Sequence, residues 1–183
     1  MFADNTLTPK EATRLCALGT LALTPMRYSA LATAVRHFIG RVLGGSLDLM
    51  APSIELLKYE GLVRPVSGKG MEDDAELTIT DQGRAELHTL LTANLRSGAT
   101  ELNKLVVGLK FRFMHLLDPA DRREQAEMLS DVCEEEIARL QDLRQSQDGD
   151  NGYLAAWLDH DIGQLEARRA WLADLVKAME AKA

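Results

Sequence analysis

Apolar side chains in the first part of the chain recur at the spacing of helices. The first predicted helix opens with Thr8, Pro9 and, three residues after the threonine, Glu11. In this order a hydroxyl and a carboxylate satisfy the free backbone N–H groups at a helix start. Two further helices are predicted at residues 28–39 and 52–59, because apolar residues recur there every three or four positions.

The period of the pattern changes after the third helix. Residues 62–67, LVRPVS, are short and contain a proline, which suits an edge strand. Residues 68–74 contain two glycines and are expected to form a turn, and in residues 75–80, AELTIT, apolar and polar side chains alternate as in a strand. Three helices, a strand, a turn, a second strand and a further helix are the order of a winged helix-turn-helix.

The remainder of the chain is expected to be helical. The apolar positions predict helices at about residues 80–95, 101–117, 120–145 and 153–178. Ser97 and Gly98 interrupt the pattern and mark a boundary. The predicted fold class is mainly α with a small two-stranded β wing. It comprises a winged helix-turn-helix domain at residues 1–97 and antiparallel C-terminal helices at residues 98–183.

Composition and charge are compatible with a globular protein that binds DNA. Apolar types make up 46% of the residues and charged types 27%, and the formal net charge is −7. Residues 98–183 carry 11 basic and 17 acidic side chains, whereas residues 27–64 carry five basic and three acidic ones. The one locally basic stretch therefore lies within the predicted helix-turn-helix, where it permits DNA binding.

The sequence favours a cytoplasmic protein. No apolar run approaches the ~18 residues of a membrane span, and the first residues lack the charged-then-apolar order of a signal peptide. Two cysteines, Cys16 and Cys133, are too few for a disulfide framework. Each falls on an apolar stripe, so both are expected in the core.

No motif of a catalytic site is present. The chain lacks a nucleophile elbow, a phosphate loop and a pair of opposed carboxylates. The only cluster of metal-ligand residue types is Asp159, His160 and Asp161, with His115 and Asp118 elsewhere. Adjacent helical residues point in different directions and cannot hold one ion together. We therefore expect neither an enzyme nor a bound metal or cofactor.

Four segments of the chain resemble the PadR-like transcriptional regulators. LGTLALTPMRYSALATAV (18–35) is similar to that family's first two helices and the Pro-Met step between them. PSIELLKYEGLVRP (52–65) is similar to its recognition helix and the strand that follows. LTITDQGRAEL (77–87) resembles the second wing strand and the next helix. EARRAWLADL (166–175) is similar to the C-terminal dimerisation region of the branch that includes virulence-gene activators.

The resemblance implies a homodimeric DNA-binding transcriptional regulator, usually a repressor. Members of the family commonly respond to a small hydrophobic effector. Two-fold pairing predicts a pseudo-palindromic operator with half-sites about one helical turn apart. The expected partners are therefore double-stranded DNA, a second copy of the chain and a small hydrophobic effector.

The helix-turn-helix and the wing are expected to supply the side chains that contact DNA. Some must reach base edges, and flanking cations must hold phosphates. On the third helix Ile54 and Leu57 should face the core, which leaves Glu55 among the outward positions. The residues predicted to contact DNA are Arg27, Tyr28, Ser29, Arg36, Arg41, Ser53, Lys58, Tyr59 and Lys69.

The last predicted helix carries an apolar stripe that suits pairing with a second copy. The residues predicted to form the dimer are Leu158, Ile162, Leu165, Trp171, Leu172 and Val176. Trp157 and Trp171 are expected to pack helix against helix, within one subunit or between two. The alternative is that one of these rings stacks on a flat effector.

A second interpretation keeps the fold without sequence-specific DNA binding. The wing carries Glu72, Asp73 and Asp74 at its tip, and carboxylates there repel phosphates. The position before the proline of the third helix is Ala51, where the resembled family usually has a tyrosine. In this interpretation the winged helix is a protein–protein interaction module.

Overall fold

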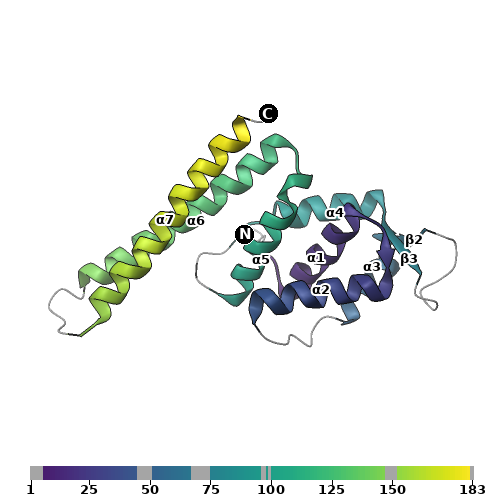
Figure 1. The fold of residues 1–183 in the computed structure, drawn as a ribbon, viewed down its shortest axis with the longest axis horizontal. Helices are drawn as coiled ribbons and strands as arrows, with labels where there is room; N and C mark the ends of the chain where they lie inside the picture. Colours follow the sequence, from purple (N-terminus) through teal and green to yellow (C-terminus); the bar gives the residue numbers. More distant parts are fainter. Residues whose placement is uncertain are drawn as a thin grey trace, which may run out of the picture. The chain divides into compact units, whose positions relative to one another are not determined.

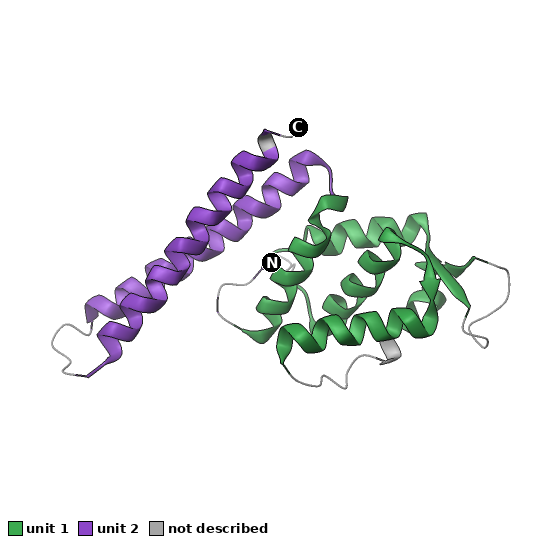
Figure 2. Cartoon of the chain, in the orientation of Figure 1, with its two compact units in different colours: residues 1–94, 99–116 green, residues 95–98, 117–183 purple. Residues whose placement is uncertain are grey.

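The computed structural model describes residues 6–44, 51–66, 75–95, 98, 100–146 and 152–181. The chain divides into two compact units, shown in different colours in Figure 2. The first unit comprises residues 1–94 and 99–116, and the second comprises residues 95–98 and 117–183.

The first unit contains five α-helices and three short strands in its described part (Figure 1). The helices are α1 (Pro9–Leu23), α2 (Tyr28–Leu43), α3 (Ala51–Tyr59), α4 (Asp81–Leu91) and α5 (Glu101–Phe113), followed by the short 3-10 helix η2 (Met114–Leu116). The strands are β1 (Met26–Arg27), β2 (Val63–Pro65) and β3 (Glu76–Ile79). This order of elements is that of a winged helix-turn-helix, as the sequence predicts.

Threonines cap the starts of the helices on which the fold depends. Thr8 Oγ1 accepts a hydrogen bond from Glu11 N–H at 3.3 Å, and Glu11 Oε2 accepts one from Thr8 N–H at 2.7 Å. The hydrogen bonds to Thr8 hold the pKa of the Glu11 carboxyl below its usual value. At the start of α4, Thr80 Oγ1 accepts from Gly83 N–H at 3.0 Å. The capping box predicted from Thr8 and Glu11 is therefore confirmed.

The three strands form one antiparallel sheet in the order β1-β3-β2. Val63 pairs with Ile79 between β2 and β3, and Arg27 pairs with Glu76 between β1 and β3. The sequence predicts the two wing strands but not β1. Two residues are too few for the alternation of side chains to reveal a strand.

Helix α1 lies at the centre of the first unit and packs against α2, α3, α4, α5 and β3 (Figure 1). Its Leu15, Leu18 and Leu21 are buried. Gly19 lets α5 approach closely, since a Cβ atom at this glycine would lie 2.6 Å from the ring of Phe113. The α1–α5 contact therefore depends on a residue without a side chain.

Helix α5 belongs to the first unit. The predicted boundary after residue 97 assigned this helix to the C-terminal part, but α5 packs on α1 and α2. Its Leu105, Leu109 and Phe113 are buried, and Lys110 is buried beside them. An amphipathic pattern shows that a helix has an apolar face, but it does not identify the element against which that face packs.

The second unit is an antiparallel pair of long helices, α6 (Pro119–Ser146) and α7 (Leu154–Glu180) (Figure 1). Its core contains Ile137, Leu140, Leu158 and Ile162. Leu154 and Leu165 pack against this cluster. These leucines and isoleucines come from the stripes that the sequence predicts on both helices.

Candidate nucleic-acid interface

Helix α3 is held by one face and exposes the other. Ile54 and Leu57 are buried, as predicted, and fix the helix against the core. The chain turns after it at Gly61, whose φ of +73° favours glycine, and Leu62 N–H donates to Leu57 O at 2.8 Å. These contacts fix the direction in which the opposite face of α3 points.

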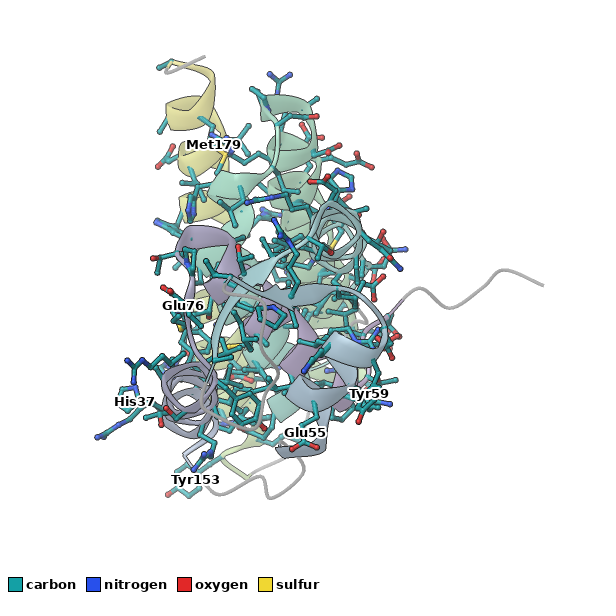
Figure 3. The ribbon with its side chains drawn as sticks, turned by 90° about the vertical axis from the view of Figure 1, so that its right-hand side faces the viewer. His37, Glu55, Tyr59, Glu76, Tyr153 and Met179 are labelled. Atoms are coloured by element: carbon teal, nitrogen blue, oxygen red, sulfur yellow. The ribbon has the colours of Figure 1, made fainter. Side chains whose placement is uncertain are left out.

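The outward face of α3 carries Glu55, Lys58 and Tyr59. Glu55 is exposed, Lys58 is half-buried and Tyr59 is 86% exposed. Residues three and four positions apart share one side of a helix, so these three side chains lie on the same surface. Figure 3 labels Glu55 and Tyr59 on this helix. Of the residues predicted here, Lys58 and Tyr59 have the expected placement.

Tyr28 joins the start of α2 to α3. Its backbone N–H donates to Ala75 O at 3.2 Å, which fixes the helix start to the end of the wing. Its phenol donates a long hydrogen bond to Glu55 Oε1, at 3.5 Å. Burial and the nearby Glu55 carboxylate raise the pKa of the Tyr28 hydroxyl, so it stays protonated and able to donate. Arg27 and Ser29, its exposed neighbours, lie at the same end of α2.

The two arginines predicted further along α2 are both exposed but lie on different sides of the helix. Arg36 follows Ser29 by seven residues, or two turns, so the two share a side. Arg41 follows Arg36 by five residues, which is about 140° around the helix axis. His37 is also exposed and is labelled in Figure 3. Ser29 and Arg36 therefore share one side of α2, two turns apart, and Arg41 lies on another side.

Exposed carboxylates accompany the cations on this surface. Glu55 lies on α3, and Glu76 lies directly across the sheet from Arg27. By contrast, the carboxylates of Glu60 and Glu86 are engaged within the fold, where they pair with Arg14 at 2.8 and 3.1 Å. The surface around α3 is thus mixed in charge.

Some of the predicted contacts lie, in whole or in part, outside the described residues. Lys69 and the acidic residues 72–74 lie outside the described residues. Ser53 is part of the described backbone of α3, but its side chain lies outside the description.

The residues predicted to form a dimer divide into two groups. Leu158, Ile162 and Leu172 are buried within their own chain. Leu165 and Val176 are half-buried, and Trp171 is 51% exposed. The second group therefore presents more surface to a partner than the first.

Trp157 is a residue that the predicted dimer set omitted. It is 54% exposed and precedes Trp171 by 14 residues, so the two rings lie within about 40° of each other around α7. The 14-residue spacing, close to four helical turns, is the sequence signal that groups Trp157 with Trp171. The chain itself covers about half of each residue and leaves the other half exposed.

Two members of the cluster of metal-ligand residue types make other contacts. Asp159 pairs with Arg144 on α6 at 3.0 Å, and a ring nitrogen of His160 lies 2.6 Å from the side-chain nitrogen of Gln164. Within the described residues no group of three or more His, Cys, Asp or Glu side chains is placed to hold a metal ion.

Both cysteines are buried, as predicted from their apolar stripes. Burial raises the pKa of the Cys16 thiol to about 12 and raises that of Cys133. A protonated, buried thiol is a poor nucleophile, so both side chains behave as core residues.

In the described part of the chain, no helix is long and apolar enough to cross a bilayer.

The order of the elements defines the class of winged helix-turn-helix proteins. The chain matches the family model of the AphA-like transcriptional regulators over residues 2–176. It belongs to this family. The match confirms the resemblance seen in the sequence, and it makes the chain a transcriptional regulator rather than an enzyme.

Solved structures with similarity to the chain include three structures of two regulators of the PadR type. A PadR-like transcriptional regulator from Bacillus cereus is 18% identical with a TM-score of 0.40, covering 93% of this chain and 99% of that one. Bacillus subtilis PadR in complex with operator DNA is 16% identical with a TM-score of 0.35, covering 91% and 98%. The same PadR in complex with p-coumaric acid is 16% identical with a TM-score of 0.36, covering 96% and 99%. A search of curated proteins gave no match.

Proposed function

We propose that the chain acts as a homodimer that binds a pseudo-palindromic operator through α3 of each copy and represses transcription. The observation that carries the proposal is the two-sided character of α3. Ile54 and Leu57 fix one face, while Glu55 and Tyr59 on the other face remain in solvent. A helix held in this way can enter the major groove with its polar face toward the base edges.

Each group of predicted contacts has a distinct role in this proposal. Lys58, Tyr59 and Ser53 read bases from α3, and Arg27, Tyr28 and Ser29 hold phosphate at the start of α2. Arg36, which shares a side of α2 with Ser29, extends the phosphate contact along the helix. The remaining predicted contacts are Arg41 and Lys69.

Support for the dimer comes from α7. Trp157 and Trp171 each expose about half of their surface, and the two rings lie within about 40° of each other around the helix. Burying such rings against a second copy removes a large apolar area from water. Two-fold pairing then sets the distance between two α3 helices, and with it the spacing of the half-sites.

A small hydrophobic effector would act by changing that distance. An apolar molecule bound against the helices that pair would tilt them and so change the affinity for the operator. The dimer then has one conformation with high affinity for the operator and one with low affinity, and the effector must bind one of them more tightly than the other. A regulator of this kind acts where the DNA is, and we expect it in the cytoplasm.

The proposal is tested by selecting bound fragments from a random pool of double-stranded DNA at roughly physiological salt. We expect a two-fold symmetric motif whose half-sites lie about one helical turn apart. The Tyr59→Ala variant, which removes an exposed ring from α3, should lose recovery of that motif. A wild-type chain that recovers nothing above background, both alone and with cell extract as a source of effector, contradicts the proposal.

A protein–protein interaction module remains the second candidate function. The observation that favours it is the pair of exposed carboxylates, Glu55 on α3 and Glu76 across the sheet from Arg27. Salt dependence separates the two functions. A DNA complex that uses several cations loses affinity steeply as salt rises, while a protein interface changes less.

A further inference from the structure

Glu55 is the one residue of the outward face of α3 whose side chain can only accept hydrogen bonds when it is ionised. It lies in the middle of the helix and shares its side with Lys58 and Tyr59. A carboxylate in this place is unexpected on a surface that approaches phosphates, because the two charges repel each other. If α3 binds DNA, the group that contacts this carboxylate must therefore be a hydrogen-bond donor.

The fold itself does not use this carboxylate as an ion-pair partner. Among the described residues no cation lies within ion-pair distance of Glu55, and its one hydrogen-bond donor is the Tyr28 hydroxyl at 3.5 Å. Glu60, five residues further along, differs in this respect because it holds Arg14 at 2.8 Å. A structural role in the core is also excluded, since Glu55 is exposed.

We propose that Glu55 is a specificity-determining residue that accepts a hydrogen bond from the exocyclic amino group of a cytosine in the major groove. The Tyr28 hydroxyl, which contacts the same carboxylate, is the positioning group that limits its rotation. The inference rests on the proposed function and deepens it, because it assigns one base of each half-site to one side chain.

The chemistry of the base edges selects cytosine. In the major groove guanine presents two acceptors and thymine presents a carbonyl acceptor, and each of these repels a carboxylate. Adenine presents an amino donor beside the N7 acceptor, so a second carboxylate oxygen there meets an acceptor. Cytosine presents the N4 amino donor, which is complementary to Glu55.

The test compares operators selected by the wild-type full-length chain and by its Glu55 variants. The affinity of each protein is then measured for the wild-type operator and for its three base replacements at every position. At one position of each half-site we expect the wild-type chain to prefer cytosine by roughly tenfold or more. Glu55→Ala should lose that preference at this position alone. Glu55→Gln should shift it toward adenine, because an amide can bond N6 and N7 together.

Two further variants separate recognition from charge and from positioning. Glu76→Gln removes the same charge from β3 and should raise affinity for all sequences alike, without changing any base preference. Tyr28→Phe removes only the hydroxyl. Loss of its phosphate contact should lower affinity for all sequences alike, and beyond this uniform loss the cytosine preference should weaken while the preferences at the other positions stay the same. Thermal unfolding of each variant establishes that the fold is retained.

The outcomes are distinguishable. A wild-type motif that Glu55→Ala and Glu55→Gln leave unchanged at every position overturns this inference and leaves the proposed function standing. The same holds if Glu55→Gln only raises affinity uniformly, as Glu76→Gln does. A wild-type chain that selects no motif, with or without extract, overturns the proposed function and this inference together.

Discussion

Lys110 is a buried cation with a structural task in the first unit. Its Nζ donates to Leu91 O at 2.6 Å and to Ala93 O at 2.7 Å. These carbonyls lie at the C-terminal end of α4, where backbone acceptors lack partners within the helix. Lys110 therefore attaches α5 to the end of α4.

Replacing Lys110 by methionine should reduce the free energy of unfolding by about 1–3 kcal/mol, because two buried carbonyls lose their donor. Methionine keeps a flexible side chain of similar length, so the loss reports the hydrogen bonds more than the packing. Urea denaturation followed by circular dichroism measures the change. Lys104→Met, at an exposed position of the same helix, is the matched control and should change stability little.

The same variant should alter the pH dependence of stability. Burial lowers the pKa of Lys110 from 10.5 to about 8. Between these values the unfolded chain binds a proton that the folded chain has lost, so the contribution of Lys110 to stability rises with pH. The wild-type chain should gain stability relative to Lys110→Met when urea denaturation is repeated at about pH 9.5 instead of about pH 7. An equal difference at both values contradicts this account.

The sequence predicts the orientation of some residues and misses that of others for a physical reason. The buried side of α3 follows from the helical period of Ile54 and Leu57, and with it the exposure of Glu55. The burial of Lys110 does not follow from any local pattern, because its acceptors lie 17 and 19 residues away in the chain. Likewise, the contact between Tyr28 and Glu55 spans 27 residues and depends on how α2 meets α3.

At the scale of elements, local signals determine where helices begin. The predicted starts at Thr8 and Thr80 are found, because each threonine side chain caps the backbone beside it. Strand β1 and the placement of α5 were missed, since both depend on partners distant in sequence. Strand β1 exists only because β3 lies beside it.

Gly83 is a sensitive contact between elements. A Cβ atom there would lie 2.1 Å from Leu62 O, an oxygen that also accepts from Thr80 N–H at 3.0 Å. We expect Gly83→Ala to force the first turn of α4 away from the start of β2 and to lower the free energy of unfolding by about 1–3 kcal/mol. Chemical denaturation measures the loss.

Gly108 on α5 offers the matched control. A Cβ atom there would lie 3.8 Å from Phe38, which is ordinary contact distance. Gly108→Ala should therefore leave stability unchanged or raise it by up to about 1 kcal/mol, the helix preference of alanine. Equal losses from both substitutions would contradict the assignment of the effect to the Leu62 backbone.

At the scale of the whole molecule, oligomeric state is the property to measure. If Trp157 and Trp171 are covered by a second copy, replacing both by alanine should shift the chain from dimer to monomer at micromolar concentration. Light scattering coupled to size-exclusion chromatography gives the mass directly. Tyr59→Ala is the contrasting variant, because it should abolish operator binding and leave the dimer intact. A wild-type monomer at the same concentration contradicts the proposed pairing.

The inclusion of α5 in the first unit determines where recombination can join this DNA-binding region to a different C-terminal region. A recombination event that joins the DNA-binding part of this chain to a different C-terminal region preserves folding only if the crossover falls after η2. A crossover at Ser97 would replace α5 and with it Phe113, whose ring packs on Gly19. Chimeric regulators built from this chain should therefore retain α5 as part of the inherited half.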